Sequence, residues 1–374
     1  MKLRRIAAIA MTLGLAVCSL TGCKISKVDD KPTSSPSTTA GATANATDAP
    51  AKLDETVLNI YTALEDEQVA EYIESFKNAH PDVTVNVTRE STGIITSKLL
   101  AEKDNPQADV VWGLSATSLL VLNQQGMLEG YAPNGVDRIL DTFKDTSSDI
   151  PKWVGIDAWE TAFVVNKDVL RSNGINDIPE TYEDLLDPQY KGLIAMSDPA
   201  SSGTGLLTVN GLLTLKGEEG GWDYMQKLDE NVAVYLHSGS APAKQTATGE
   251  YGIGISFGYR CIKSAADLGE NGVVVFPKEG SGYDIEANAL IKHSEGEKEI
   301  AKAFLDWAIA DEQMTKYAAN YPIVATGVGD QIPEGYAQNP IDQLIKNIDF
   351  DWCAENREAI LTKWTELFGA KSHE

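Results

Sequence analysis

The stretch "VLNIYTALEDEQVAEYIESFKNAHPDVTVNVT", residues 57–88, decides the fold class because a strand, a helix and a second strand follow one another in it. Val57–Tyr61 predicts a buried strand, and Val83–Thr88 predicts the second. Between them, apolar residues recur at the spacing of one helix face: Val69, Tyr72, Ile73 and Phe76. A unit of this kind predicts an α/β fold with parallel strands.

The same pattern continues toward the C-terminus. Ser91-Thr92-Gly93 opens a predicted helix, Asp109–Trp112 predicts a third strand, and small polar residues follow at Gly113–Thr117. Repeated strand, loop and helix units predict a mostly parallel sheet with helices on both faces. Ligands of such sheets bind beyond the carboxyl ends of the strands, so we expect the chemistry in the loops that follow them.

The N-terminus predicts export. Basic residues precede the apolar run Ile6–Val17, which is too short to span a bilayer as a mature helix but suits a secretory signal. The run ends in "LTGC", residues 20–23, which resembles the lipoprotein cleavage motif. We therefore expect a signal peptide over residues 1–22 and a lipidated Cys23.

Composition then separates a linker from the folded part. Residues 23–54 are dominated by Ser, Thr, Ala, Pro and Gly and predict a flexible tether. The remainder is too long for one core of average size, so we expect two lobes. No later segment is apolar enough to cross a membrane. A net charge of −24 argues against nucleic acid or acidic lipid as a partner.

Two cysteines remain beyond Cys23, namely Cys261 and Cys353. Their spacing leaves a disulfide and two free buried thiols equally open.

Six loops after predicted strands carry the candidate chemistry: Thr62–Glu67, Glu90–Gly93, Gly113–Thr117, Ser197–Gly205, His237–Pro242 and Phe257–Arg260. Three of them contain the clusters "STG", "SSGTG" and "SGSAP". Helix capping explains any one such cluster. Three together favour a shared anion cradle, in which glycines admit the backbone and N–H groups at helix starts point at the charge. Such a cradle is built from neutral hydroxyls and backbone dipoles, so we expect it to need no positive side chain.

The chain also resembles a known family. The ordered segments "IYTALEDEQ", "RESTGIITSKLLAEKDNPQADVVWGLSATSLL", "SDPASSGTG", "GISFGYR" and "EGSGYDIEANALIK" are similar to those of the extracytoplasmic solute-binding proteins of ABC importers. The similar branch is assigned to 2-aminoethylphosphonate uptake and is related to the ferric-ion binders. The resemblance implies an α/β, two-lobed periplasmic-binding-protein type II fold with the ligand cleft between the lobes. It further implies a monomer outside the cytoplasm, lipid-anchored at the cell surface or in the periplasm, with ABC permease partners, no cofactor and no enzymatic activity.

Within this fold we expect lobe one to comprise residues 55–156 and 283–325, and lobe two residues 157–282 and 326–374. The segments "DAWETAFVVN" and "GYDIEANALI" resemble the crossings between lobes. One continuous sheet over residues 55–374 would contradict this arrangement.

The implied ligand is a zwitterion with a phosphonate and an ammonium end. The residues expected to bind the phosphonate are Ser91, Thr92, Ser201, Ser202, Gly203, Thr204, Ser238 and Ser240. For the ammonium we favour the carboxylate of Glu65, with Glu160, Asp284 and Glu286 as second candidates. Trp112 and Tyr259 are expected to wall the short carbon chain.

Three alternatives remain open. The first is a general phosphate or phosphonate binder. The second is a ferric-ion binder, whose relatives use adjacent tyrosines, whereas Tyr259 lies between Gly258 and Arg260, and the histidines lack ligand spacing. The third is a phosphoester enzyme, against which the chain lacks a Gly-x-Ser-x-Gly elbow, a phosphate-binding Gly-Lys-Ser/Thr loop and a His/Asp metal cluster. We interpret Lys244 as a solvent-facing helix lysine.

Overall fold

The structure is a computed structural model that describes residues 54–373. The predicted signal peptide, the lipidation site Cys23 and the linker, except for its last residue, lie outside the described residues. Over residues 54–373 the helices are all too short or too polar to cross a bilayer.

The strands of the sheet are short apart from β5 and β10. In chain order they are β1 (Val57–Thr62), β2 (Thr84–Arg89), β3 (Val110–Ser115), β4 (Leu128–Glu129), β5 (Val154–Asn166), β6 (Ile194–Ser197), β7 (Val232–Leu236), β8 (Ile253–Phe257), β9 (Gly272–Val275), β10 (Tyr283–Ile291), β11 (Ile323–Val324), β12 (Gly327–Val328) and β13 (Ser372–His373).

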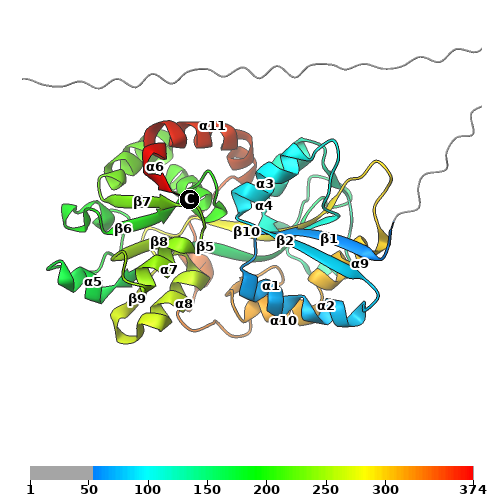
Figure 1. The fold of residues 1–374 in the computed structure, drawn as a ribbon, viewed down its shortest axis with the longest axis horizontal. Helices are drawn as coiled ribbons and strands as arrows, with labels where there is room; N and C mark the ends of the chain where they lie inside the picture. The colour runs from blue at the N-terminus through cyan, green and yellow to red at the C-terminus, as the bar shows by residue number, and fades with distance from the viewer. Residues whose placement is uncertain (1–53, 374) are drawn as a thin grey trace, which may run out of the picture. The chain divides into compact units, whose positions relative to one another are not determined.

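The α-helices surround these strands (Figure 1). They are α1 (Asp66–Tyr72), α2 (Glu74–Ala79), α3 (Thr92–Ala101), α4 (Ala116–Gln124), α5 (Lys167–Ser172), α6 (Gly203–Asp229), α7 (Ala241–Ala247), α8 (Gly258–Leu268), α9 (Glu299–Ala308), α10 (Asp311–Ala318) and α11 (Phe350–Phe368).

The three strands expected at the start of the chain are β1, β2 and β3. Two short helices, α1 and α2, take the place of the single helix expected between β1 and β2. The helix is interrupted at Ile73, which is the C-cap residue of α1 and the N-cap residue of α2. α6 is likewise interrupted at Gly217, whose φ of +73° and ψ of 163° are not helical and favour glycine.

The sheet is mixed, which corrects the expectation of a mostly parallel one. β2, β1 and β3 pair in parallel, as do β7, β6 and β8. β5 and β10 instead run antiparallel to each other, and also to β8 and β3 respectively. β5 and β10 contain the two segments that were expected to cross between the lobes, and the chain returns along β10 in the direction opposite to β5.

Strand pairing is continuous from β13 to β2 through β5 and β10. We expected that residues 55–374 would not form one continuous sheet, and this expectation is wrong, because strand pairing continues through β5 and β10. The first half of β5 pairs with β10, and its second half pairs with β8 and β9, so a single strand joins both halves of the sheet.

Two large hydrophobic clusters nevertheless lie apart. The first cluster is built from β1, β3, α1, α2, α9, α10 and their neighbours, and includes Trp112 and Phe304. The second cluster is built from β6, β7, α6 and α11, and includes Tyr182 and Trp364. In Figure 1, β1 and β2 lie on one side of β5 and β10, and β6 and β7 lie on the other. The exact lobe boundaries stay a prediction.

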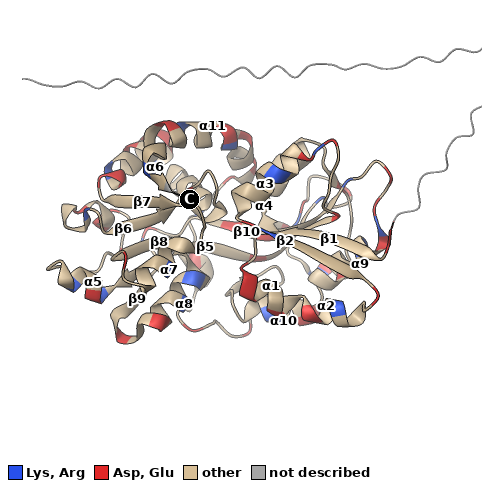
Figure 2. Ribbon diagram, in the orientation of Figure 1, with Lys and Arg blue, Asp and Glu red and all other residues tan. Residues whose placement is uncertain are grey.

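Charged residues lie mostly on the helices and loops around the strands (Figure 2). Cys261 and Cys353 are both free and buried, which answers the open question of a disulfide. Burial raises the pKa of both thiols, so neither is a reactive thiolate at neutral pH.

Candidate functional site

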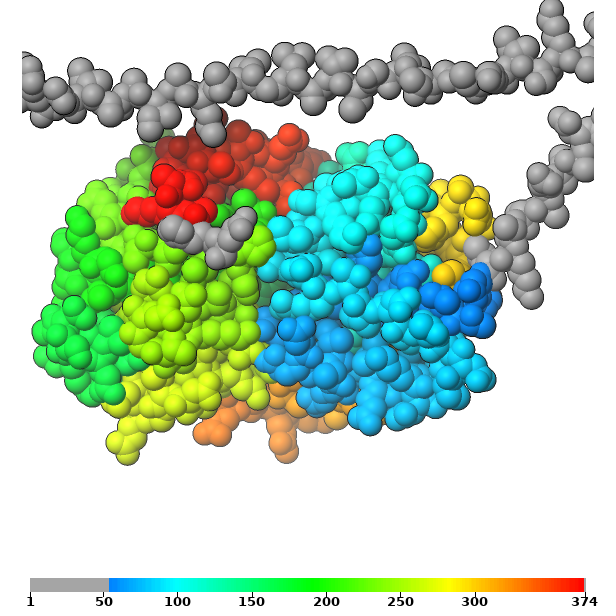
Figure 3. Space-filling view, in the orientation of Figure 1, coloured from blue at the N-terminus to red at the C-terminus, as the bar shows by residue number. Residues whose placement is uncertain are grey.

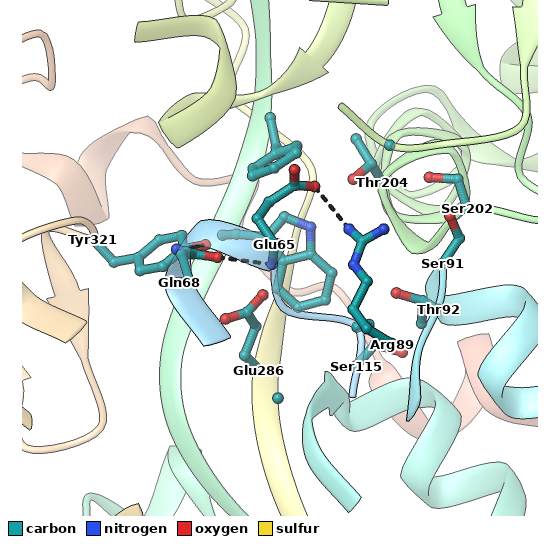
Figure 4. Close-up of a pocket in the computed structure, with 15 residues that line it drawn as sticks. Glu65, Gln68, Arg89, Ser91, Thr92, Ser115, Ser202, Thr204, Glu286 and Tyr321 are labelled. Carbon is teal, nitrogen blue, oxygen red and sulfur yellow. Dashed lines mark hydrogen bonds and ion pairs between the residues drawn. The ribbon is translucent and has the colours of Figure 1, made fainter. Parts of the chain in front are cut away.

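One cavity lies where elements of the two clusters meet (Figure 4). On the face shown in Figure 3, the blue and cyan residues of the N-terminal part meet the green residues along one boundary. The residues that line the cavity are Ala63, Glu65, Gln68, Arg89, Ser91, Thr92, Gly113, Ser115, Trp159, Ser202, Thr204, Gly239, Phe257, Glu286 and Tyr321. Each of the six loops expected to converge contributes at least one of them.

The first wall of the cavity is formed by the starts of α3 and α6. Ser91 is the N-cap residue of α3 and Ser202 that of α6. The backbone N–H of Gly93 donates to the carbonyl of Ser201 over 2.9 Å, which ties the two helix starts together. A Cβ on Gly203 would lie 2.7 Å from Thr92 Oγ1, so this close approach requires glycine.

This wall presents hydroxyl groups to the cavity. Ser91, Thr92, Ser202 and Thr204 all line it, and Figure 4 shows them on one side. Hydroxyls beside two helix N-termini suit an oxyanion, because the aligned peptide dipoles leave partial positive charge there.

Arg89 adds a full positive charge beside these hydroxyls. It is the last residue of β2, and its Nε donates to the carbonyl of Leu64 over 2.9 Å, which fixes the guanidinium. Figure 4 shows the guanidinium between Glu65 and the hydroxyl wall. A positive side chain thus lies beside the hydroxyl wall, where only neutral hydroxyls and backbone dipoles were expected, and a planar guanidinium is well suited to a phosphonate or phosphate.

Glu65 lies at the start of α1 and is held by three cations. Its Oε1 is 3.1 Å from Arg89 Nη2, and its Oε2 is 3.1 Å from Lys244 Nζ and 3.5 Å from Arg260 Nη2. Arg260 also pairs with Glu67. Lys244 on α7 is thus an ion-pair partner as well as half exposed, which corrects its interpretation as a merely solvent-facing lysine.

A second wall of the cavity is acidic. Glu286 on β10 lines it, with a side chain only 9% exposed. Trp159, Phe257 and Tyr321 provide apolar surface nearby and belong to one small buried cluster. The cavity therefore combines a cationic and hydroxyl-rich wall, an acidic wall and aromatic surface.

Six of the fourteen expected ligand residues line the cavity: Glu65, Ser91, Thr92, Ser202, Thr204 and Glu286. The other eight do not, and most of them have structural roles.

Four of these eight lie in or next to the hydroxyl-rich loops. Ser201 turns its hydroxyl to the carbonyl of His237 over 2.7 Å, and Gly203 packs on Thr92. Ser238 and Ser240 share a hydrogen bond of 3.1 Å, and Gly239 between them lines the cavity instead.

Two further residues are carboxylic acids of the crossing strands. Asp284 accepts a 2.5 Å hydrogen bond from Thr117 Oγ1, and burial raises its pKa to about 7. Glu160 faces Gly258, where a Cβ would lie 2.5 Å from its Oε1, and burial raises its pKa to about 8.

The last two are aromatic. Trp112 is fully buried in the first cluster, where its indole N–H donates to the hydroxyl of Tyr317 over 3.2 Å. Tyr259 stacks on Phe257 with ring centroids 6.4 Å apart, and burial raises its pKa to about 12.

The most important residue that sequence reasoning missed is Arg89. It directly precedes the loop Glu90–Gly93, and a positive charge next to "STG" was the available signal. Ser115, Gly239 and Phe257 lie in loops that had been singled out, but no pattern distinguished them from their neighbours. Nothing local in the sequence pointed to Tyr321, which reaches the cavity from after α10 and accepts a hydrogen bond from Gln68 over 3.0 Å.

Metal-ion chemistry finds little support in the part of the chain that the structure describes. No group of three or more His, Cys, Asp or Glu side chains there is arranged to hold a metal ion. Tyr259 does not line the cavity, and its neighbours in the sequence, Gly258 and Arg260, are not the adjacent tyrosine expected of a ferric site.

A family model described as "Bacterial extracellular solute-binding protein" matches residues 71–341. An uncharacterized protein of Haemophilus influenzae is 30% identical over 296 residues, which cover 76% of this chain and 83% of that protein. The probable ABC transporter periplasmic-binding protein y4fP of Sinorhizobium fredii is 25% identical over 309 residues, covering 79% and 82%.

Solved structures are similar as well. The periplasmic binding protein AfuA from Actinobacillus pleuropneumoniae, with exogenous fructose-6-phosphate bound, gives a TM-score of 0.75 at 28% identity over 83% of this chain and 98% of that one. Iron-bound HitA from Pseudomonas aeruginosa gives 0.67 at 18% identity, over 82% and 99%, and bears on the fold alone. These similarities confirm the expected α/β fold class.

Proposed function

Because the chain belongs to the bacterial extracellular solute-binding proteins, we propose that it captures 2-aminoethylphosphonate outside the cytoplasm and delivers it to the permease of an ABC importer. The name of the relative y4fP supports the importer, since it is a probable ABC transporter periplasmic-binding protein. The protein acts as a monomeric binding component without turnover, anchored to the membrane through lipidated Cys23.

The observation that carries the choice of ligand is the pairing of two unlike walls in one cavity. Arg89 and the four hydroxyl residues Ser91, Thr92, Ser202 and Thr204 offer donors to a phosphonate. A carboxylic acid lines the same cavity and offers an acceptor to an ammonium group. A short zwitterion satisfies both walls at once, whereas inorganic phosphate satisfies only the first.

The position of each carboxylic acid narrows the choice of the one that accepts the ligand's ammonium group. Of the four carboxylic acids considered for it, Glu65 and Glu286 line the cavity, while Glu160 and Asp284 do not. Glu65 already faces Arg89, Lys244 and Arg260, which compete with a ligand ammonium for its oxygens.

A sugar phosphate is the second candidate ligand. The structure of AfuA with fructose-6-phosphate bound favours it, because that protein is 28% identical over most of this chain. A phosphorylated sugar would use the same Arg89 and hydroxyl wall, and its own hydroxyls would take the place of the ammonium. A ferric ion is a weaker candidate than either of these ligands, because Tyr259 has no adjacent tyrosine and the histidines lack ligand spacing.

Isothermal titration of the protein tests the proposal. We expect 2-aminoethylphosphonate to bind more tightly than ethylphosphonate, inorganic phosphate or fructose-6-phosphate. Tighter binding of fructose-6-phosphate would transfer the assignment to sugar phosphates, and equal binding of all four would leave a general oxyanion binder. Release of product from phosphate or phosphonate esters would contradict the absence of turnover. Loss of fatty-acid labelling in Cys23→Ala checks the lipid anchor.

A further inference from the structure

Two acidic side chains lie side by side on the crossing strands, at the acidic wall of the cavity. Asp157 on β5 and Glu286 on β10 are directly opposite in the antiparallel register. Asp157 is fully buried and Glu286 is 9% exposed, so both are at least nine-tenths removed from water. Only Glu286 lines the cavity, and Asp157 lies behind it.

The carboxyl oxygens of this pair receive few donors from the described part of the chain. Neither oxygen of Asp157 nor Oε2 of Glu286 accepts a hydrogen bond from an N–H or hydroxyl group of residues 54–373, and the remaining partner is the hydrogen bond that protonated Asp157 donates to Glu286. Buried polar atoms normally find partners, and leaving them unpaired is costly. Glu286 at the cavity wall therefore keeps acceptor capacity for a donor that arrives with a ligand.

The charged and titratable groups around the pair are mostly acids or phenols. Asp284 is on the same strand as Glu286, Glu160 is on the same strand as Asp157, and Glu65 faces Glu286 from the start of α1. Tyr72, Tyr317, Tyr321 and Tyr336 approach from α1, α10 and the segments after α10. The nearby cations Arg89, Lys244 and Arg260 pair with Glu65 instead.

Burial, followed by the charge of Glu286, raises the pKa of Asp157 well above its usual range. Burial also raises the pKa of Glu286; the hydrogen bond from Asp157 opposes this rise, and the charges of Glu65 and Asp284 add to it. Without a nearby cation of its own, the pair retains protons at neutral pH.

We propose that Glu286 receives the protonated amine of the ligand, with Asp157 as its positioning residue, and that the pair releases a proton to water as the amine binds. This inference rests on the proposed function and names the residues that select an aminated over a non-aminated phosphonate. The proton balance is simple: the ligand keeps its ammonium proton, one carboxylic acid of the pair becomes a carboxylate, and the proton goes to solvent. The new carboxylate and the ammonium neutralise each other within the cavity.

The test is calorimetric titration with 2-aminoethylphosphonate in two buffers of different ionisation enthalpy, which gives the number of protons released per ligand. The phosphonate group can itself take up or release a proton on binding. This contribution is common to the wild type and Glu286→Gln, so the difference between their proton counts reports the carboxyl pair. We expect the wild type to release more protons than the variant, by up to about one per ligand. We expect Glu286→Gln to weaken 2-aminoethylphosphonate roughly ten- to a hundredfold and to leave ethylphosphonate binding nearly unchanged.

Two further variants separate this role from a structural one. Asp157→Asn is expected to lower the proton count while retaining part of the preference for the aminated ligand. Glu160→Gln is the matched control, because Glu160 is also a buried acid of β5 with a raised pKa but does not line the cavity. It is expected to leave the preference for the aminated ligand unchanged and to change the proton count only slightly, through the charge of Glu160 that raises the pKa of Asp157.

The outcomes are distinguishable. If the wild type binds 2-aminoethylphosphonate, and Glu286→Gln binds it equally well with the same proton count, this inference is overturned while the proposed function stands. If the wild type does not bind 2-aminoethylphosphonate, the proposed function is overturned and this inference with it.

Discussion

Arg89 is the side chain on which the oxyanion wall of the cavity depends most. Replacing it by glutamine removes the guanidinium but keeps a side chain at the end of β2, and Glu65 retains Lys244 and Arg260 as partners. We expect Arg89→Gln to weaken every phosphonate or phosphate ligand by roughly 1.5–3 kcal/mol, as for a hydrogen bond to a charged group. Titration calorimetry measures this loss. Arg171→Gln is the control, since Arg171 is an exposed arginine that pairs with Asp168 away from the cavity, and unchanged affinity in Arg89→Gln would contradict the role of Arg89.

Glu160 makes stability depend on pH. Its folded-state pKa of about 8 lies above the ordinary glutamate value of 4.5, because burial disfavours the carboxylate. Between these values the folded protein binds more protons than the unfolded chain, so this group's contribution to the free energy of unfolding falls as pH rises, and it levels off above about pH 8. Relative to Glu160→Gln, we expect the wild type to lose about 4 kcal/mol at most between pH 5 and 8.

Urea unfolding at several pH values checks the prediction for Glu160. Glu219→Gln serves as the control, because Glu219 is exposed on α6. Parallel pH profiles for the wild type and Glu160→Gln would show that Glu160 does not titrate as argued.

For single residues, the sequence predicted which residue types lie at the cavity better than it predicted the direction in which their side chains point. The hydroxyls of Ser91 and Ser202 were predicted because they precede helix starts, where capping residues and anion-binding residues coincide. The same reasoning failed for Ser201, because a one-residue step turns its hydroxyl to the carbonyl of His237. It also missed Arg89, because this residue lies between the predicted strand Val83–Thr88 and the predicted loop Glu90–Gly93.

The start of α6 is the element that fixes the hydroxyl wall. A Cβ on Gly205 would lie 2.5 Å from the carbonyl oxygen of Ser197 and 2.6 Å from the nitrogen of Pro199, both backbone atoms. We expect Gly205→Ala to push α6 away from β6, with a loss of roughly 1–3 kcal/mol in stability, as for overpacking. Weaker ligand binding is expected to accompany this loss.

Gly220→Ala is the matched substitution in the same helix. A Cβ there has Lys216 Cβ, at 3.5 Å, as its closest neighbour, so alanine fits. We expect it to be neutral or to stabilise by up to about 1 kcal/mol through helix propensity. Chemical unfolding compares the two variants, and equal stabilities would refute the packing argument for Gly205.

Strands were predicted well where the pattern of apolar residues lies within the strand itself. β1, β2 and β3 lie within a residue or a few of their expected ranges, because a strand's period is visible in the strand itself. The direction of β5 and β10 was not predictable in this way, since nearly every residue of both strands is buried and neither sequence carries a mark of pairing direction.

Across the whole molecule, Glu65 connects elements of the first cluster to α7 and α8. Its pairs with Lys244 and Arg260 cross the cavity, so they stabilise the arrangement described above, in which the two sides of the cavity are held together and which we call closed. We expect Glu65→Gln to reduce this preference by roughly 1–3 kcal/mol, because Lys244 is half exposed and its pair is weak while Arg260 is mostly buried. Small-angle X-ray scattering without ligand is expected to show a larger radius of gyration.

Glu102→Gln provides the comparison for this experiment, because Glu102 pairs with Lys98 at the end of α3 and does not cross the cavity. Identical scattering from Glu65→Gln, Glu102→Gln and the wild type would mean that the ion pairs of Glu65 do not influence closure.

Fold class was predictable at this scale because strand–helix units repeat along the chain and the segments resembling solute-binding proteins are spread over it. The continuous pairing through β5 was not, because it depends on two strands more than a hundred residues apart in sequence. The lobe boundaries drawn from the sequence stay a prediction.

The insertion of β10 between β3 and β5 sets the order in which the chain can fold. β6, β7, β8 and β9 come from one stretch, residues 194–275, so most strands around the second cluster can meet early. The first cluster is complete only once β10, α9 and α10 have joined β1, β2 and β3, and Leu290 of β10 pairs with Val110 from far upstream. Such non-local contacts raise the contact order and slow folding, so refolding is expected in two kinetic phases, with the first cluster in the slower one.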